Sequence, residues 1–378
     1  MSSISVNTIT DASGGATTSI NGFTPTVSNM AGRNRIINGD MRIDQRNAGA
    51  SVTSITSSTY TLDRWKLDIG GTGTFTMQQS TSAPAGFSNS LSLTCTSATA
   101  SPNVIYLEQK IEGFNLSDFA FNTASAATFT ISFWVKSNKT GTYVVLPYNT
   151  SATRMIGKTY TINSANTWEQ KTLTFVGDTA AAIPNSNANG LEIRFWLAAG
   201  STWSSGTLPS TWASDVTANE AAGQTVNLAD TTSNTFYITG VQLEEGSVAT
   251  PFCPAGGGSY GAELALCQRY YEKQYEQSVV PGTNLGNDQQ SWFTALAGSS
   301  TNRYSNSVPF KVTKRTRPTL SFWDYNGASG QWKTGAAGQT ETATTVAGSH
   351  ANENAISTVW FATGNNWAYG FWTASAEL

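Results

Sequence analysis

Residues 191–197 read Leu-Glu-Ile-Arg-Phe-Trp-Leu, so apolar side chains occupy every second position along most of this stretch. Because successive side chains of a β-strand point to opposite faces, this period of two predicts a strand with one buried face. Similar stretches, separated by turns that contain Gly, Asn or Pro, occur at residues 74–78, 91–95, 128–136, 143–146, 168–176 and 235–243. Short, alternating strands in such number predict a two-sheet sandwich of the jelly-roll kind.

The composition agrees with an all-β chain. Only 12% of the residues are charged, about half the usual share of a soluble domain. Helix surfaces are usually built from charged and long polar residues, whereas Thr-rich stretches with interleaved aromatic residues suit strands. The net charge of −3 gives no general basic face, which argues against nucleic acid as a partner.

Targeting and metal signals are weak. No apolar run reaches the roughly 18 residues of a membrane span, and the polar residues 1–10 do not form a signal peptide. Three cysteines, Cys95, Cys253 and Cys267, are too few for a disulfide framework, so we expect free thiols. One histidine and no C-x-x-C pair argue against zinc.

The chain divides into four parts. Residues 1–33 form a polar leader that we expect to become ordered on a larger particle, with a flexible tail as the alternative. Residues 34–252 form the jelly roll. Residues 253–275 are a Gly/Pro-rich linker followed by a short helix from Ala262 to Tyr275. Residues 276–378 return to strand patterns, which predict a smaller C-terminal β-sandwich domain.

Four stretches carry a resemblance to a known family. They are residues 34–46 (NRIINGDMRIDQR), 240–252 (GVQLEEGSVATPF), 267–272 (CQRYYE) and 372–378 (WTASAEL). Together they resemble the tail-fibre and related appendage proteins of tailed bacteriophages. The resemblance implies a homotrimeric virion subunit, assembled in the host cytoplasm, released by lysis and attached to other virion proteins through its leader. Within that leader, the candidate attachment residues are the apolar Ile4, Val6, Ile9 and Phe23.

The two ends of the jelly roll also look like those of carbohydrate-binding modules, in which a closing-strand aspartate helps to hold a structural calcium. Here Thr239 and Gly240 stand in that region, which leaves Asp40 and Asp44 as candidate calcium ligands. The alternative is that Asp40 caps a turn beside Gly39. We expect no other cofactor.

Aromatic residues are abundant for so polar a chain, with 12 Trp, 13 Tyr and 17 Phe. An aromatic ring can stack on the apolar side of a sugar, with polar neighbours bonding its hydroxyl groups. The candidate glycan-binding residues lie in the polar insert 201–230 and around the Asn326-Gly327 turn of a predicted hairpin at 320–333; they are Trp203, Trp212, Trp323, Tyr325 and Trp332. The alternative is burial in the core, which is common for Trp.

No enzyme is predicted. The lone His350 lies in a polar stretch that reads as a loop, and no motif pairs the two carboxylates that glycoside hydrolysis needs. We therefore expect non-catalytic, multivalent binding of host polysaccharide or lipopolysaccharide. A purely structural virion protein (a fibre adaptor or head-decoration protein) and a polysaccharide depolymerase remain alternatives. The basic run 311–317 either contacts an anionic partner or is a solvated edge strand.

Overall fold

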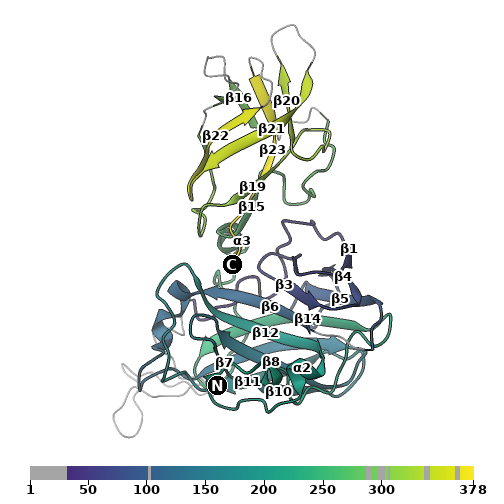
Figure 1. Ribbon diagram of the computed structural model, residues 1–378, viewed down its shortest axis with the longest axis vertical. Coiled ribbons are helices and arrows are strands. Elements are labelled where there is room, and N and C mark those ends of the chain that lie inside the picture. The colour runs from purple at the N-terminus through teal and green to yellow at the C-terminus, as the bar shows by residue number, and fades with distance from the viewer. Residues whose placement is uncertain are drawn as a thin grey trace, which may run out of the picture.

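The structure is a computed structural model that describes residues 32–100, 104–286, 307–335, 341–361 and 367–378, with the backbone of residues 292–295 and 303–304. Two β-rich bodies lie one above the other along the long axis, with the larger sandwich below and the distal domain above (Figure 1). The predicted attachment residues Ile4, Val6, Ile9 and Phe23 lie outside the described residues. Within the described part, no helix is long and apolar enough to cross a membrane.

The sandwich consists of two antiparallel sheets. The first has, in spatial order, the strands β1 (Val52–Ile55), β4 (Thr74–Ser80), β5 (Ser90–Ser97), β14 (Thr235–Glu245), β7 (Phe129–Ser137) and β11 (Glu169–Phe175). The second has β13 (Ala213–Ser214), β9 (Arg154–Met155), β8 (Gly141–Asn149), β12 (Asn189–Ala199), β6 (Val104–Glu112), β3 (Lys66–Gly70) and β2 (Thr59–Tyr60), with β10 (Lys158–Ile162) also on β8. Each predicted strand of this region is present.

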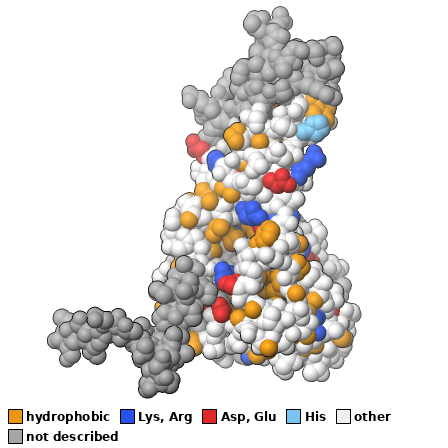
Figure 2. Space-filling model, turned by 90° about the vertical axis from the view of Figure 1, so that its left-hand side faces the viewer, with side chains coloured by type: hydrophobic (Ala, Val, Ile, Leu, Met, Phe, Trp, Pro, Cys, Tyr) orange, Lys and Arg blue, Asp and Glu red, His pale blue; other side chains and the backbone are white. Residues whose placement is uncertain are grey.

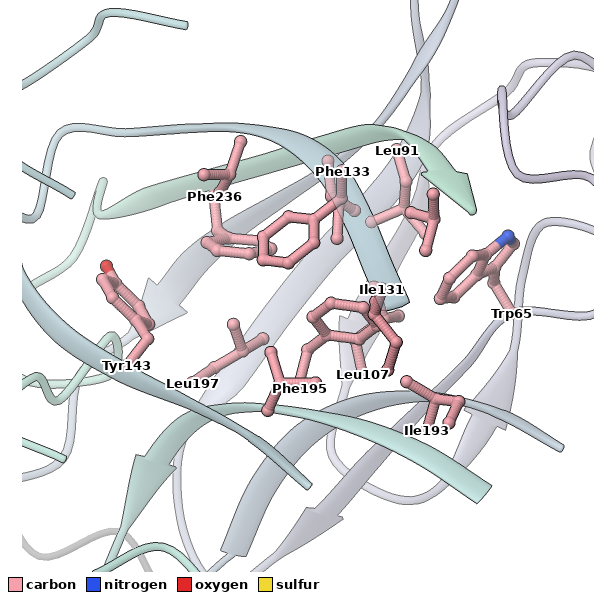
Figure 3. Packing of buried hydrophobic residues seen from close by; sticks show 14 of the residues in the cluster. Trp65, Leu91, Leu107, Ile131, Phe133, Tyr143, Ile193, Phe195, Leu197 and Phe236 are labelled. Atoms are coloured by element: carbon pink, nitrogen blue, oxygen red, sulfur yellow. The ribbon is translucent and has the colours of Figure 1, made fainter. Parts of the chain in front are cut away.

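The core fills the space between the two sheets (Figure 3). Its members are the apolar halves of the alternating patterns: Ile131 and Phe133 from β7, and Ile193 and Phe195 from β12, are all fully buried. Phe133 and Phe195 meet edge to face across the sandwich, with ring centroids 5.2 Å apart. In these strands the period of two thus places one face in the core, as the sequence predicts.

Strand β14 changes face halfway along. Phe236 and Ile238 are buried in the core, and so are Val241 and Leu243, although the two pairs differ in parity. A bulge between Thr239 and Gln242 makes the shift, and Gly240 takes a positive φ of 61° within it. A Cβ at this position would come within 2.6 Å of the Phe87 ring, so only glycine fits.

The distal domain forms around one long strand, β23 (Trp367–Ser375). Its neighbours are β15 (Tyr271–Lys273), β16 (Trp292–Ala295), β19 (Thr319–Trp323) and β20 (Gln331–Gly335), and the domain continues through β21 (Thr342–Ala351), β22 (Ala355–Phe361), β17 (Arg303–Tyr304) and β18 (Val308–Pro309). A separate core contains Phe322, Trp332, Phe361 and Trp372. The predicted all-β fold is confirmed.

Two predicted elements differ in detail. The helix α3 runs from Tyr260 to Gln268 and stops before Tyr275, because residues 271–273 form β15 and pair with residues 373–375 of β23. Likewise, β19 and β20 are joined by a turn, but β19 and residues 333–335 of β20 pair with β23 instead of forming a regular hairpin. Both differences come from pairing with a strand more than 30 residues away, which local patterns do not report. The remaining helices are short: η1 (Gly113–Phe119), α2 (Ser201–Ser204) and η2 (Thr217–Asn219).

Buried charges join the two domains. Arg64, only 1% exposed, forms an ion pair with Glu377 near the C-terminus, and its guanidinium lies 3.4 Å from the centre of the Tyr270 ring. Arg46 bonds the same carboxylate at 3.1 Å. On the other side of the junction, Arg269 holds Glu112 at 2.7 Å.

The basic run 311–317 belongs to this junction. Lys314 is buried against Glu272, and Arg315 donates to the backbone carbonyl oxygens of Asn187, Ala376 and Glu377. Neither side chain is a solvated edge charge, so that prediction is wrong for both of them. Arg315 binds the distal domain to the sandwich through Asn187, whereas Lys314 is buried between α3, β15 and its own loop.

The substitution Glu377→Gln should destabilise the chain by about 3–5 kcal/mol, because it leaves the buried Arg64 guanidinium without its counter-charge. Chemical denaturation followed by tryptophan fluorescence measures this. The matched control is Asp118→Asn, which breaks the more exposed Arg35–Asp118 pair and should cost less than about 1 kcal/mol. Equal losses from both substitutions would contradict the structural role of Arg64 and Glu377.

Candidate functional site

A pair of stacked tyrosines forms a half-buried aromatic platform on the distal domain. The rings of Tyr325, in the turn after β19, and Tyr369, on β23, lie 5.6 Å apart at an angle of 13°. The Tyr325 hydroxyl donates to Glu341 at 2.8 Å, and the Lys333 ammonium lies 5.2 Å from the Tyr325 ring centre. We call these four residues the tyrosine platform.

The turn that carries Tyr325 is held by a buried carboxylate. One oxygen of Asp324 accepts from the backbone N–H groups of Asn326 and Ala328, at 3.0 and 2.9 Å, and Gly327 takes a positive φ. The same carboxylate lies 3.4 Å from Lys333. The Asn-Gly signal in the sequence therefore marked a real turn, and this turn sets the position of Tyr325.

The platform combines apolar and polar groups at short range. The Glu341 carboxylate beside its hydroxyl raises the pKa of Tyr325. Burial and the same carboxylate raise the pKa of Tyr369. Both hydroxyls therefore remain protonated near neutral pH; the Tyr325 proton is donated to Glu341, whose remaining lone pairs can accept from a ligand, while Lys333 can donate. Flat rings bordered by such groups suit a ligand that has an apolar face and several hydroxyls.

Of the predicted tryptophans, only Trp323 lies close to this platform. It is half-buried and packs edge to face on Tyr275, with ring centroids 6.3 Å apart. Trp332 is completely buried in the distal core, where its indole N–H donates to the carbonyl oxygen of Phe371 at 3.1 Å. Its faces contact core side chains such as Phe322, so the prediction that Trp332 binds glycan is wrong.

The two tryptophans of the insert lie on the sandwich. Trp212 is 9% exposed, packs on Phe121, and donates its indole N–H to the carbonyl oxygen of Val176 at 2.8 Å. Trp203 is half-buried against the ring of Trp196, 5.7 Å away. The structure therefore does not bring these residues together with the platform, and Trp212 serves the core.

A second candidate surface, which motif searching missed, is the outer face of the β3, β6, β12 and β8 strands. Its residues form rows across the sheet. In one row, Glu108 lies opposite Lys66 on one neighbouring strand and opposite Arg194 on the other. In another row, Glu192 lies opposite Lys110 on one side and opposite Tyr148 on the other. Tyr106 lies in the neighbouring row. We call this surface the charged face. The alternation of residues 191–197 could have predicted this face, since Glu192 and Arg194 occupy the positions of that strand that point away from the core.

Arg194 organises the charged face. Its guanidinium donates to Glu192 and to Glu220, both at 2.6 Å, and lies 4.1 Å from the centre of the Tyr148 ring. Burial raises the pKa of Glu220 to about 7, although Arg194 acts in the opposite direction. For Glu192, burial is outweighed by Arg194 and Lys110, which lower its pKa. The two carboxyl groups around the Arg194 guanidinium thus have pKa values shifted in opposite directions.

The predicted calcium ligands have other partners. Asp40 forms an ion pair with Arg42, and Asp44 accepts from the backbone N–H groups of Asn47 and Gly49, at 3.0 and 2.9 Å. Among the described residues, no group of three or more acidic, His or Cys side chains is placed to hold a metal ion. The geometry of Asp44 is that of a turn cap. All three cysteines are free thiols.

No family model and no curated protein matches the sequence. Among solved structures, the chain is similar to the enzymatically active domain of tailspike protein 4 of bacteriophage CBA120, with 15% identity over 56% of this chain and 21% of that one (TM-score 0.30). It is also similar to the C-terminal family 22 carbohydrate-binding module of Clostridium thermocellum Xyn10B (14% identity, 50% of this chain, 89% of that one, TM-score 0.27). A third similar structure is the family 11 carbohydrate-binding module of Clostridium thermocellum in complex with a mixed-linked tetrasaccharide (11% identity, 52% of this chain, 98% of that one, TM-score 0.26).

These likenesses concern the fold alone, because the identities are low. The chain spans about a fifth of the tailspike domain and nearly all of each carbohydrate-binding module. The sites and the proposals below therefore rest on the residues of this chain.

The substitution Glu220→Gln tests the charged face through its pH dependence. Since the folded chain holds the Glu220 proton up to about pH 7 and the unfolded chain only up to 4.5, its stabilising effect is lost as the pH rises between these values. The free energy of unfolding of the unsubstituted chain, relative to Glu220→Gln, should fall from pH 5 to pH 7 by at most about 1.4 kcal/mol per unit. Denaturation at several pH values measures it.

The matched control for that experiment is Glu169→Gln. Hydrogen bonds from Lys171 and from the backbone of Ser164 and Asn163 outweigh the effect of burial and lower the pKa of Glu169 to about 2. Its contribution is therefore constant between pH 5 and pH 7. A flat difference for Glu220→Gln, equal to that of the control, would show that Glu220 is ionised throughout.

Proposed function

We propose that this chain is a subunit of a tailed-bacteriophage virion appendage, and that its distal domain binds host-surface glycan without breaking bonds. The observation that carries the proposal is the tyrosine platform: two stacked, half-buried rings with a carboxylate at one hydroxyl and an ammonium over one face. The phage assignment is supported by the four sequence stretches described above. Three of them, 34–46, 267–272 and 372–378, contribute Arg46, Tyr270 and Glu377 to the junction of the two domains.

Binding would proceed by stacking of the apolar side of a sugar on the exposed parts of Tyr325 and Tyr369. Glu341 would accept from one sugar hydroxyl and Lys333 would donate to another. A single small contact of this kind is weak, so attachment would depend on several copies acting together. In a homotrimer fixed to the virion through residues 1–33, binding at one site would raise the effective concentration of the other two sites, and this would increase the overall affinity.

The test is a phage adsorption assay on host cells pre-incubated with the full-length chain. The full chain is needed because Arg64, Arg269 and Arg315 bind the distal domain to the sandwich. We expect dose-dependent inhibition, which Tyr325→Ala should weaken at least tenfold by removing half of the stacked pair. Tyr325→Phe, which keeps the ring, should lie between the two.

The control variant is Tyr260→Ala, which removes an equally large but 45% exposed tyrosine at the start of α3. It should inhibit adsorption as well as the unsubstituted chain. If the folded chain fails to inhibit adsorption at any concentration, the receptor-binding proposal is wrong, and a purely structural virion part becomes the better assignment.

A depolymerase is the second candidate, favoured by one observation on the charged face. Glu192 and Glu220 flank Arg194 with pKa values shifted in opposite directions, which is the arrangement that an acid and a base require. Incubation with host polysaccharide tests it, with release of reducing ends as the readout. We expect none from the unsubstituted chain. Release that Glu192→Gln abolishes would assign hydrolysis to this face.

A further inference from the structure

A surface cavity on the sandwich lies apart from both candidate sites. Its volume is about 230 Å³.

The residues that line it include Asp40, Arg42, Phe87, Ser88, Phe252 and Pro254. They come from the turn after Asn38, the loop before β5 and the linker before α3. The volume is below the roughly 300–1,000 Å³ of sites for drug-sized ligands, so the cavity suits a single small ring.

The cavity has an apolar wall. The rings of Phe87 and Phe252 lie 5.2 Å apart at an angle of 56°. Phe87 is held in place by the close approach of Gly240 in the β14 bulge, where any larger residue would collide with its ring. Two half-buried aromatic rings thus present an apolar surface to whatever enters.

Polar groups of both signs complete the lining. Asp40 and Arg42 form an ion pair, so their net charge is zero. The Oδ1 atom of Asp40, a residue that is 6% exposed, has no hydrogen-bond partner among the described residues, and neither has the Nη2 atom of Arg42. An unpartnered buried acceptor and an unpartnered buried donor each cost free energy that a suitable ligand would recover.

We infer that this cavity binds a neutral monosaccharide unit, with its apolar face on Phe87 and Phe252 and two neighbouring hydroxyls on Asp40 and Arg42. One hydroxyl donates to the carboxylate and the next accepts from the guanidinium, which a vicinal diol does without a net charge. An anion would be repelled by Asp40 and a cation by Arg42. The inference goes beyond the proposed function, because it assigns a second site on the other domain.

The experiment is saturation-transfer NMR of the full-length chain with three probes: methyl β-glucoside, methyl β-galactoside and methyl α-mannoside. Ser88→Trp fills the cavity from an exposed position, and Arg42→Met removes the donor while keeping an apolar stem. We expect at least one probe to bind the unsubstituted chain, and each substitution to weaken that binding at least tenfold. Thermal unfolding of each variant verifies that it is folded.

Two controls separate this site from the others. Ser58→Trp places the same bulk at an exposed serine away from the cavity, and Tyr325→Ala alters the tyrosine platform. Neither should change the binding that Ser88→Trp removes. Binding that is lost only with Tyr325→Ala would overturn this inference and leave the proposed function standing. Absence of binding by all three probes, or binding unchanged by Ser88→Trp, would also overturn it.

Discussion

The buried ion pair between Arg64 and Glu377 is the contact on which the arrangement of the two domains depends. It joins a residue just before β3 to one beside the C-terminus, and the Tyr270 ring covers the guanidinium. Removing two charges from water is costly, so such a pair persists only when further hydrogen bonds satisfy it. Arg64 also donates to the carbonyl oxygen of Lys110, and Glu377 also accepts from Arg46. The result is a junction that fixes the direction in which the distal domain extends.

Pairing of charged groups is common throughout the chain. Charged residues are few, and many of them lie in networks, at the junction or on the charged face, rather than singly in solvent. On the face that Figure 2 shows, charged side chains form only small, scattered patches. A surface of hydroxyl and amide groups has little long-range electrostatic attraction, so recognition by this protein would rely on short-range stacking and hydrogen bonding.

The candidate sites illustrate what local patterns reveal. The Asn326-Gly327 turn was predictable, and with it the place of Tyr325 at a turn, because this dipeptide favours a turn with a positive φ at its glycine. Tyr369 and Glu341 could not be assigned to the same site, since 16 residues separate Glu341 from Tyr325 and 44 separate Tyr369 from it in the sequence. Their meeting follows from the pairing of β20 with β23. For the same reason, the sequence suggested Trp332 as a binding residue because it is aromatic and near a turn, whereas strand pairing places it in the core.

The sequence by itself determined the all-β fold and the strands of the sandwich, because a period of two in hydrophobicity allows only one face to be buried. It also predicted the Asn326-Gly327 turn, whose glycine takes a positive φ. Only the tertiary structure decided that α3 gives way to β15, that Arg315 joins the two domains, and that Phe87 meets Phe252 beside Asp40. These contacts link residues far apart in the chain, so they stabilise the fold only after the intervening strands have paired, and no local sequence pattern reports them.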